Sequence, residues 1–189
     1  MADFVRNGYG QVEPNHLSAQ KTGQIYAQLP ADDNITQLEN GQFAKYNYVA
    51  GKVDFSTAAT SGEWMMVFNE VHTYDERDRF YKDFAMVKSD YVDGVITPRL
   101  IKTNIGDIFT TNTIKVAGSK RTDVTMITDV ETGGTNVAQV TPGAVYQVNA
   151  DGFLEYAATP DPDDGPQFAV VKFYTLADGQ QAIKFQRIA

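Results

Sequence analysis

The side chains that most often carry catalysis or bind metal ions are scarce in this sequence. There are two histidines, His16 and His72, and no cysteine. A zinc site needs three or four nitrogen or sulfur ligands. A serine nucleophile needs a base beside it, and no Gly-x-Ser-x-Gly turn is present to offer one. We therefore expect no metal, no cofactor and no enzyme activity, and we interpret His72 as an exposed strand residue.

An acidic stretch, DPDDGP at Asp161–Pro166, comes closest to a calcium-binding loop. The EF-hand loop places a glycine at position six and a bidentate glutamate at position twelve. Here Gly165 stands at position five and Lys172 at position twelve. The stretch is therefore predicted to be an acidic surface turn.

The composition excludes several classes of partner. The 189 residues carry a net charge of −8, whereas nucleic-acid binding needs clustered lysine and arginine. The longest apolar run, Trp64–Phe68, is far shorter than the ~20 residues of a membrane helix. The first residues lack the apolar core of a signal peptide, and the absence of cysteine fits a reducing compartment. We expect a soluble protein made in the cytoplasm, with no nucleic acid and no membrane as partner.

Two phrases occur twice in the chain. GKVDFSTAAT at Gly51–Thr60 resembles GFLEYAAT at Gly152–Thr159, and TGQIYAQ at Thr22–Gln28 resembles IGDIFTT at Ile105–Thr111. Any two strands with glycine turns look somewhat alike, but the shared Ala-Ala-Thr ending and the common order exceed what turns require. The pattern predicts an internal duplication whose second copy has an insertion at Lys115–Thr135.

The repeat defines the predicted organisation of the chain. It gives an N-terminal arm (1–20), a first β-domain (21–98) and a second β-domain (99–189), either as two small domains or as two pseudo-symmetric halves of one fold. Three further segment pairs follow in the same order: Asn40-Gly41 with Pro142-Gly143, Gly62–Val71 with Pro166–Thr175, and Arg79–Val87 with Gln181–Ala189.

Turn dipeptides between short runs of β-branched and aromatic residues predict an all-β fold with at most short helices. The clearest unit is a hairpin from Val171–Thr175 to Ile183–Arg187 with a two-residue turn at Asp178-Gly179. The segment Tyr74–Val92 has apolar residues at helical spacing, yet the repeat aligns it with this hairpin. We favour the hairpin, and the helix stays as the alternative.

The first twenty residues contain scattered apolar side chains with no periodic face. Glycines and a proline between them discourage a helix. The segment is either a frayed terminus or an extended arm that docks on another protein and is loosely held in the isolated chain. In the second case the partner-binding residues are Phe4, Val5, Tyr9, Val12 and Leu17.

The acidic, cysteine-free, β-rich composition, the opening FVRNGYGQVEPNHLSAQKTGQIYAQLP and the run GDIFTTNTI resemble virion proteins of tailed bacteriophages. The likeness is greatest to small head proteins that decorate or cement the capsid. It implies a β-rich protein on the capsid surface, bound to the major capsid protein or other virion proteins, and a possible homo-oligomer. Many such proteins form trimers, and the duplication here departs from their single-domain pattern.

Two other functions fit the same sequence. One is a tail, neck or head-fibre component of the virion. The other is a carbohydrate-binding module, in which Trp64, Tyr46 or Tyr48 would stack on sugar rings. Trp64 lies in an apolar run, which favours a place in the core.

Overall fold

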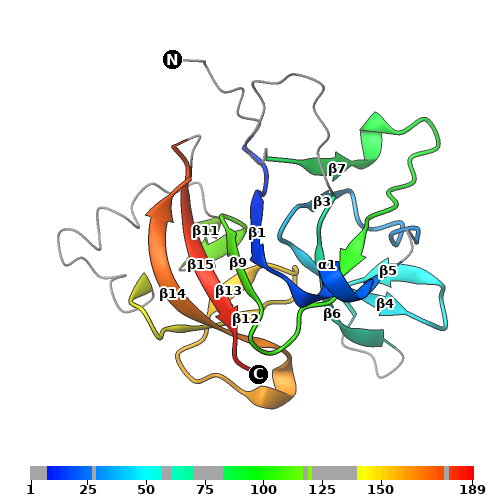
Figure 1. Cartoon of the computed structure of the whole chain (residues 1–189). Coiled ribbons are helices and arrows are strands. Elements are labelled where there is room, and N and C mark those ends of the chain that lie inside the picture. The colour runs from blue at the N-terminus through cyan, green and yellow to red at the C-terminus, as the bar shows by residue number, and fades with distance from the viewer. Residues whose placement is uncertain are drawn as a thin grey trace.

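The computed structural model describes residues 8–26, 29–56, 61–69, 83–116, 119–120, 140–176 and 179–189. Strands dominate these residues, which contain one α-helix, α1 (Ser18–Thr22), and two short 3-10 helices, η1 (Lys88–Asp90) and η2 (Pro162–Asp164). The predicted all-β class is confirmed. Figure 1 shows two sheet regions side by side, with the N-terminal strand β1 between them.

The strands form three sheets. The eight-stranded sheet has the order β1-β9-β15-β14-β12-β13-β10-β11, with bounds β1 Val12–His16, β9 Ile108–Thr111, β10 Ile114–Val116, β11 Ser119–Lys120, β12 Val145–Val148, β13 Leu154–Tyr156, β14 Gln167–Thr175 and β15 Gln181–Arg187. The five-stranded sheet has the order β2-β8-β6-β4-β5, with bounds β2 Ile25–Tyr26, β4 Phe43–Asn47, β5 Lys52–Asp54, β6 Ser61–Val67 and β8 Leu100–Ile101. The third pairs β3 (Gln37–Glu39) with β7 (Ala85–Val87).

The five-stranded sheet has the same connectivity as the middle of the larger sheet. Numbered along the chain, β2, β4, β5, β6 and β8 have the spatial order 1-5-4-2-3, and β9, β12, β13, β14 and β15 have that order too. In each set the third strand also receives a parallel neighbour: Ala31 pairs with Val53, and Ile114 pairs with Leu154. The shared order agrees with the sequence alignment, while a common origin of the two halves stays a prediction.

Several details differ from the sequence-based predictions. The strand β8 belongs to the first sheet, so the halves divide between residues 101 and 108 rather than at 98. It also takes the position that the alignment gave to Arg79–Val87, because β7 pairs with β3 instead. Residues 74–82 lie outside the described residues, and Tyr74–Val92 contains only β7 and η1 among those described.

The predicted C-terminal hairpin is confirmed as β14 and β15, with Phe173 opposite Ile183. Pairing continues beyond Thr175 to a hydrogen bond from Leu176 N to Gln180 O (2.7 Å). Asp178 of the predicted two-residue turn lies outside the described residues. Gly179 has the positive φ (83°) that glycine often supplies in hairpin connections.

One hydrophobic core joins the two halves, so they are not independent domains. Phe43 of the five-stranded sheet is fully buried, and its ring lies 5.2 Å from that of Phe168 and 6.4 Å from that of Phe109 in the larger sheet. The Phe43 amide also donates to Gly152 O at 2.7 Å. Aromatic pairs at these distances stabilise the folded state beyond the contribution of the apolar area that they bury.

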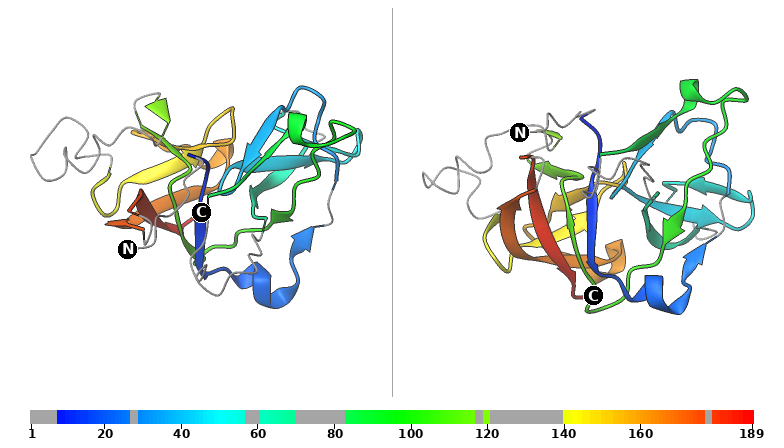
Figure 2. Two further views of the ribbon diagram at one scale, coloured as in Figure 1. Left: turned by 90° about the horizontal axis from the view of Figure 1, so that it is seen from above. Right: turned by 45° about the horizontal axis from the view of Figure 1, so that its top comes forward.

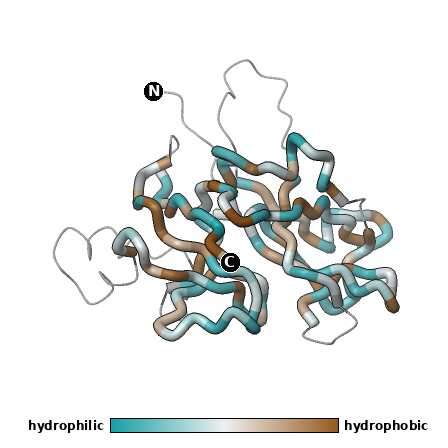
Figure 3. Tube along the Cα trace, turned by 60° about the horizontal axis from the view of Figure 1, so that its bottom comes forward, coloured by the Kyte–Doolittle hydropathy of each residue, from teal (hydrophilic) through white to brown (hydrophobic). Residues whose placement is uncertain are grey.

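The five-stranded sheet is buried on both faces, which explains its uninterrupted apolar run. Trp64 and Met66 face the shared core, whereas Met65 and Val67 face a second cluster with Leu38 and other residues of the first half. Side chains alternate across a strand, so burial on both faces requires a continuous apolar sequence. Hydrophobic and hydrophilic stretches alternate along the traces of both halves in Figure 3.

The strand β1 closes the edge of the larger sheet that lies toward the smaller one (Figure 2). It pairs antiparallel with β9, with Val12 opposite Thr111. The helix α1 then leads to β2 in the other sheet and ends at Gly23, whose φ of 71° is the left-handed conformation common at helix ends. The N-terminal segment therefore connects both halves.

Candidate functional site: the loop end

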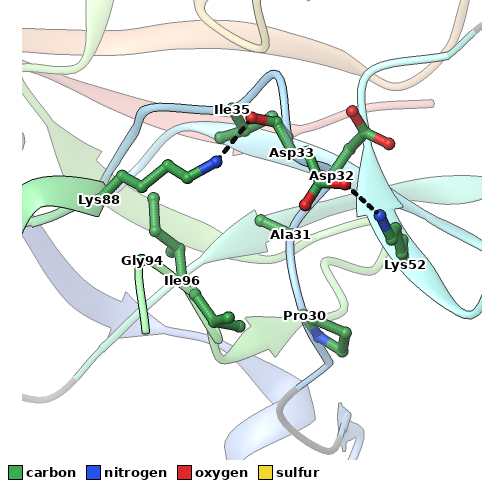
Figure 4. A pocket seen from close by; sticks show the side chains of 10 residues that line it. Pro30, Ala31, Asp32, Asp33, Ile35, Lys52, Lys88, Gly94 and Ile96 are labelled. Atoms are coloured by element: carbon green, nitrogen blue, oxygen red, sulfur yellow. Dashed lines mark hydrogen bonds and ion pairs between the residues drawn. The ribbon is translucent and has the colours of Figure 1, made fainter. Parts of the chain in front are cut away.

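A pocket of about 220 Å³ lies in the first half. Three parts of the chain form it: segment 30–35, Lys52 of β5 and residues 88–96 after β7 (Figure 4). Its lining is Pro30, Ala31, Asp32, Asp33, Ile35, Lys52, Lys88, Gly94, Val95 and Ile96.

Backbone hydrogen bonds hold these walls in place. Pro30 O accepts from Val53 N at 2.9 Å, and Asp32 N donates to Val53 O at 2.8 Å. The opposite wall is attached through Ala31 N, which donates to Ile96 O at 2.7 Å. Segment 30–35 runs parallel to β5 and forms hydrogen bonds with the backbone groups on the outer edge of that strand. These bonds fix the position of the pocket floor.

The two lysines of the pocket are both bound to Asp33. Lys52 Nζ lies 2.9 Å from Asp33 Oδ2, and Lys88 Nζ donates to Asp33 O at 2.9 Å (Figure 4). The hydrogen bond from Lys52, and then its charge, lower the pKa of Asp33, and the same hydrogen bond raises the pKa of Lys52. Both charges of this pair persist at neutral pH, and the pair is exposed to solvent.

Exposed apolar side chains occur in two loops of the same half. Val92 is fully exposed and Val95 is 44% exposed in the loop after η1, while Tyr48 and Val49 are 64% and 80% exposed at the tip of the β4–β5 hairpin. Both loops lie at the same end of the first half (Figures 1 and 2). We call the pocket together with Tyr48, Val49, Val92 and Val95 the loop end.

The ring of Tyr48 has a defined position on the hairpin. Tyr46 contacts it edge-on, with ring centroids 4.6 Å apart. A Cβ placed on Gly62 would lie 3.0 Å from Tyr48 Cε2, so the ring packs close to the backbone of β6. The exposed aromatic surface is therefore held by its neighbours.

The structure places the predicted arm residues differently from the sequence analysis. Phe4 and Val5 lie outside the described residues. Tyr9 is half-buried, and its N–H donates to Asp83 Oδ2 at 3.1 Å. Val12 and Leu17 are each 2% exposed within the shared core, so the prediction that they contact a partner is wrong.

The reason is that β1 adds to a sheet edge of its own chain. A strand adds to a sheet where the edge strand has unpaired backbone groups and where apolar side chains can be buried. Without β1, β9 would be such an edge strand. Burying an apolar side chain stabilises by roughly 1.5–3 kcal/mol, and an intramolecular partner requires no loss of translational freedom. The predicted boundary at residue 20 therefore separates segments that fold together.

The structure also locates several other residues that the sequence analysis singled out. Residues 161–164 are exposed, and the Asp161 side chain accepts from Asp163 N at 2.9 Å, which makes this stretch the expected surface turn. Trp64 is 6% exposed and belongs to the core. His16 is exposed on β1, and His72 lies outside the described residues. In the part of the chain that the structure describes, no group of three or more acidic or histidine side chains could hold a metal ion.

Sequence reasoning missed the loop end. Val92 and Val95 flank the turn dipeptide Asp93-Gly94, and apolar residues in a polar turn were the available signal. The pocket itself had no sequence signal, because two of its walls, segments 30–35 and 88–96, are more than fifty residues apart.

Comparison with protein families, curated sequences and solved structures gave no match. No helix among the described residues has the length and apolar character needed to cross a membrane.

Proposed function

We propose that this protein is a structural component of a tailed-phage virion that binds the assembled capsid surface and decorates or cements neighbouring major capsid subunits. It would be made in the host cytoplasm and end on the virion surface. A tail, neck or head-fibre position is the alternative within the same class. The proposed role is binding, with no enzyme activity.

The observation that carries the proposal is the set of exposed apolar residues at the loop end. Large apolar side chains such as Tyr48, Val49 and Val92 remain exposed in the folded chain, and exposed apolar surface is typical of protein interaction sites. The capsid as partner comes from the sequence resemblance. Two halves joined by one core provide a rigid support for such a surface.

The direct test has two steps. Mass spectrometry of purified particles should detect the chain, and particles separated into heads and tails should place it on heads. The expressed chain should then cosediment with shells assembled without it. The double variant Val49→Asp/Val92→Asp should bind at least about tenfold more weakly, because two charges would be placed in an apolar contact.

A matched control is Ile105→Asp, since Ile105 is 72% exposed in another loop. It should bind like the natural chain. Absence of the chain from particles, or equal binding by the double variant and the control, would contradict the proposal.

The N-terminal residues are tested separately. Deleting residues 1–7 removes Phe4 and Val5 but leaves β1 intact. If these two side chains contact the shell, the truncated chain should keep its unfolding midpoint and lose affinity for shells. Unchanged affinity would restrict the binding surface to the folded part.

Carbohydrate binding is a second candidate, supported by the exposed Tyr48 ring packed against Gly62. A ring with one open face can stack on a sugar, and Trp64 is excluded by its burial. Titration with a soluble hexasaccharide, followed by NMR, should shift Tyr48 ring signals if this function holds. Tyr48→Ala should abolish any such binding.

A further inference from the structure

The pocket of the loop end has the size of a single side chain. Its volume is about 220 Å³, and cavities of ~150 Å³ already admit benzene. Five of its lining residues are apolar: Pro30, Ala31, Ile35, Val95 and Ile96. Val95 stands partly exposed among them, so an apolar side chain entering the pocket would gain contacts with both floor and rim.

The segments that form the pocket carry an excess of negative charge, although Asp90 and Asp93 are not among the residues that line it. Segments 30–35 and 88–96 together with Lys52 contain four carboxylates, those of Asp32, Asp33, Asp90 and Asp93, and two amines, which leaves a local charge of −2. Both amines are already bound to Asp33. Asp90 and Asp93 are exposed.

From this combination we propose that the pocket binds an apolar side chain of a partner protein, in an extended segment where lysine or arginine flanks the apolar residue. The apolar residue, of leucine or methionine size, enters between Ile35 and Val95. The flanking cations lie over Asp90 and Asp93. A second copy of this chain fits less well, because it brings a net charge of −8 to segments that carry a net charge of the same sign. The proposal rests on the binding role proposed above and names the chemistry of the partner surface.

The test uses the full isotope-labelled chain and three capped tripeptides: Lys-Leu-Lys, Glu-Leu-Glu and Lys-Ser-Lys. The first should shift the amide signals of Gly94, Val95 and Ile96, with affinity in the millimolar range that falls as salt is raised. The other two should bind at least about fivefold more weakly, since one reverses the charge contacts and the other removes the apolar anchor.

Charge-reversal variants identify the rim. Asp93→Lys should weaken Lys-Leu-Lys binding and strengthen Glu-Leu-Glu binding. Asp163→Lys, at an exposed aspartate of η2 in the other half, should change neither. Equal binding of all three tripeptides, or no shift at residues 94–96, would overturn the inference.

Two further outcomes separate this inference from its premise. If the chain is found on capsids but no tripeptide binds, the virion function stands and the pocket is not its contact. If sedimentation shows a dimer that Val95→Asp dissociates, the occupant is a second copy, and the inference of a basic partner is wrong.

Discussion

The two halves have the same strand order, but their corresponding hairpins expose different side chains. The β4–β5 hairpin presents Tyr48 and Val49 to solvent, whereas the β12–β13 hairpin presents Ala150 and Asp151. The backbone of the β12–β13 hairpin also contacts the first half, because Gly152 O accepts from Phe43 N and Asp151 O accepts from Gln42 Nε2. A shared framework thus has one tip that contacts the neighbouring half and one tip left free, and we infer that the free tip serves binding.

An ion pair also joins each hairpin to the segment that runs parallel to it, but the lysine and the aspartate have exchanged places between the two halves. In the first half, Lys52 on the hairpin binds Asp33 on the parallel segment, while in the second half Lys115 on the parallel strand binds Asp151 on the hairpin. The contact is retained although the residues are exchanged. Position in the fold therefore determines the contact, and an internal duplication followed by divergence stays our prediction for its origin.

The largest expected effect tests whether the halves unfold together. Phe43→Ala should lower the free energy of unfolding by about 3–5 kcal/mol, because it removes a fully buried ring from between the two sheets. Urea unfolding followed by Trp64 fluorescence, which reports on the shared core, and by circular dichroism, which reports on the strands of both halves, should give one shared transition. Val92→Ala, at a fully exposed site, should change stability by less than about 0.5 kcal/mol. Two separate transitions would contradict the shared core.

The next effect compares Gly51 with Gly152, which occupy corresponding places in the two hairpins and have φ of 64° and 80°. Alanine at either position is strained by about 1–2 kcal/mol in this left-handed conformation. At Gly51 nothing lies within 4 Å of an added Cβ, whereas at Gly152 it would lie 2.1 Å from Phe43 O. Gly152→Ala should therefore destabilise by at least about 2 kcal/mol more than Gly51→Ala in thermal unfolding. Equal losses would mean that the contact between the halves relaxes easily.

The sequence allowed the framework to be predicted but not its surfaces. Repeated glycines and alternating runs identified the strands around Gly51 and Gly152, because local turn geometry and strand periodicity are written in neighbouring residues. Burial of Trp64 followed from its apolar run. The destination of β1 did not, because scattered residues such as Val12 and Leu17 suit any open edge, and the fold of the same chain supplied one.

Non-local contacts limited the rest. The position of β8 depends on pairing with β6, more than thirty residues away, and Leu100–Ile101 is too short to have a sequence pattern. The loop end combines three segments whose proximity depends on the parallel contact between Ala31 and Val53. Such a contact has no signal in either segment alone.

A smaller effect tests the matched turns. Asn47 Oδ1 accepts from Val49 N and Ala50 N, and its amide donates to Asp54. Asn149 repeats this with Asp151 N, Phe153 N and Glu155. Each asparagine-to-alanine change should cost about 1 kcal/mol of unfolding free energy, and the two losses should add. A loss at only one asparagine, measured by urea unfolding, would mean that the two turns share this type of hydrogen bonding but differ in its energy.

The smallest effect concerns Lys52 and Asp33 at the loop end. Lys52 lowers the pKa of Asp33 below its ordinary value of 3.8, first through the hydrogen bond and then through charge. A carboxyl with a depressed pKa in the folded state stabilises the protein above its unfolded pKa, and this contribution is lost as pH falls through the folded pKa.

Lys52→Met should therefore return the pKa of Asp33 toward 3.8, measured by NMR titration of its side-chain carboxyl. Lys88→Met should raise it less, because Lys88 acts on Asp33 only weakly, through its charge. In both variants the pocket should keep its shape, since backbone bonds of Pro30, Ala31 and Asp32 hold it. If Lys88→Met raises the pKa more than Lys52→Met does, the ion pair across the pocket is assigned to the wrong lysine.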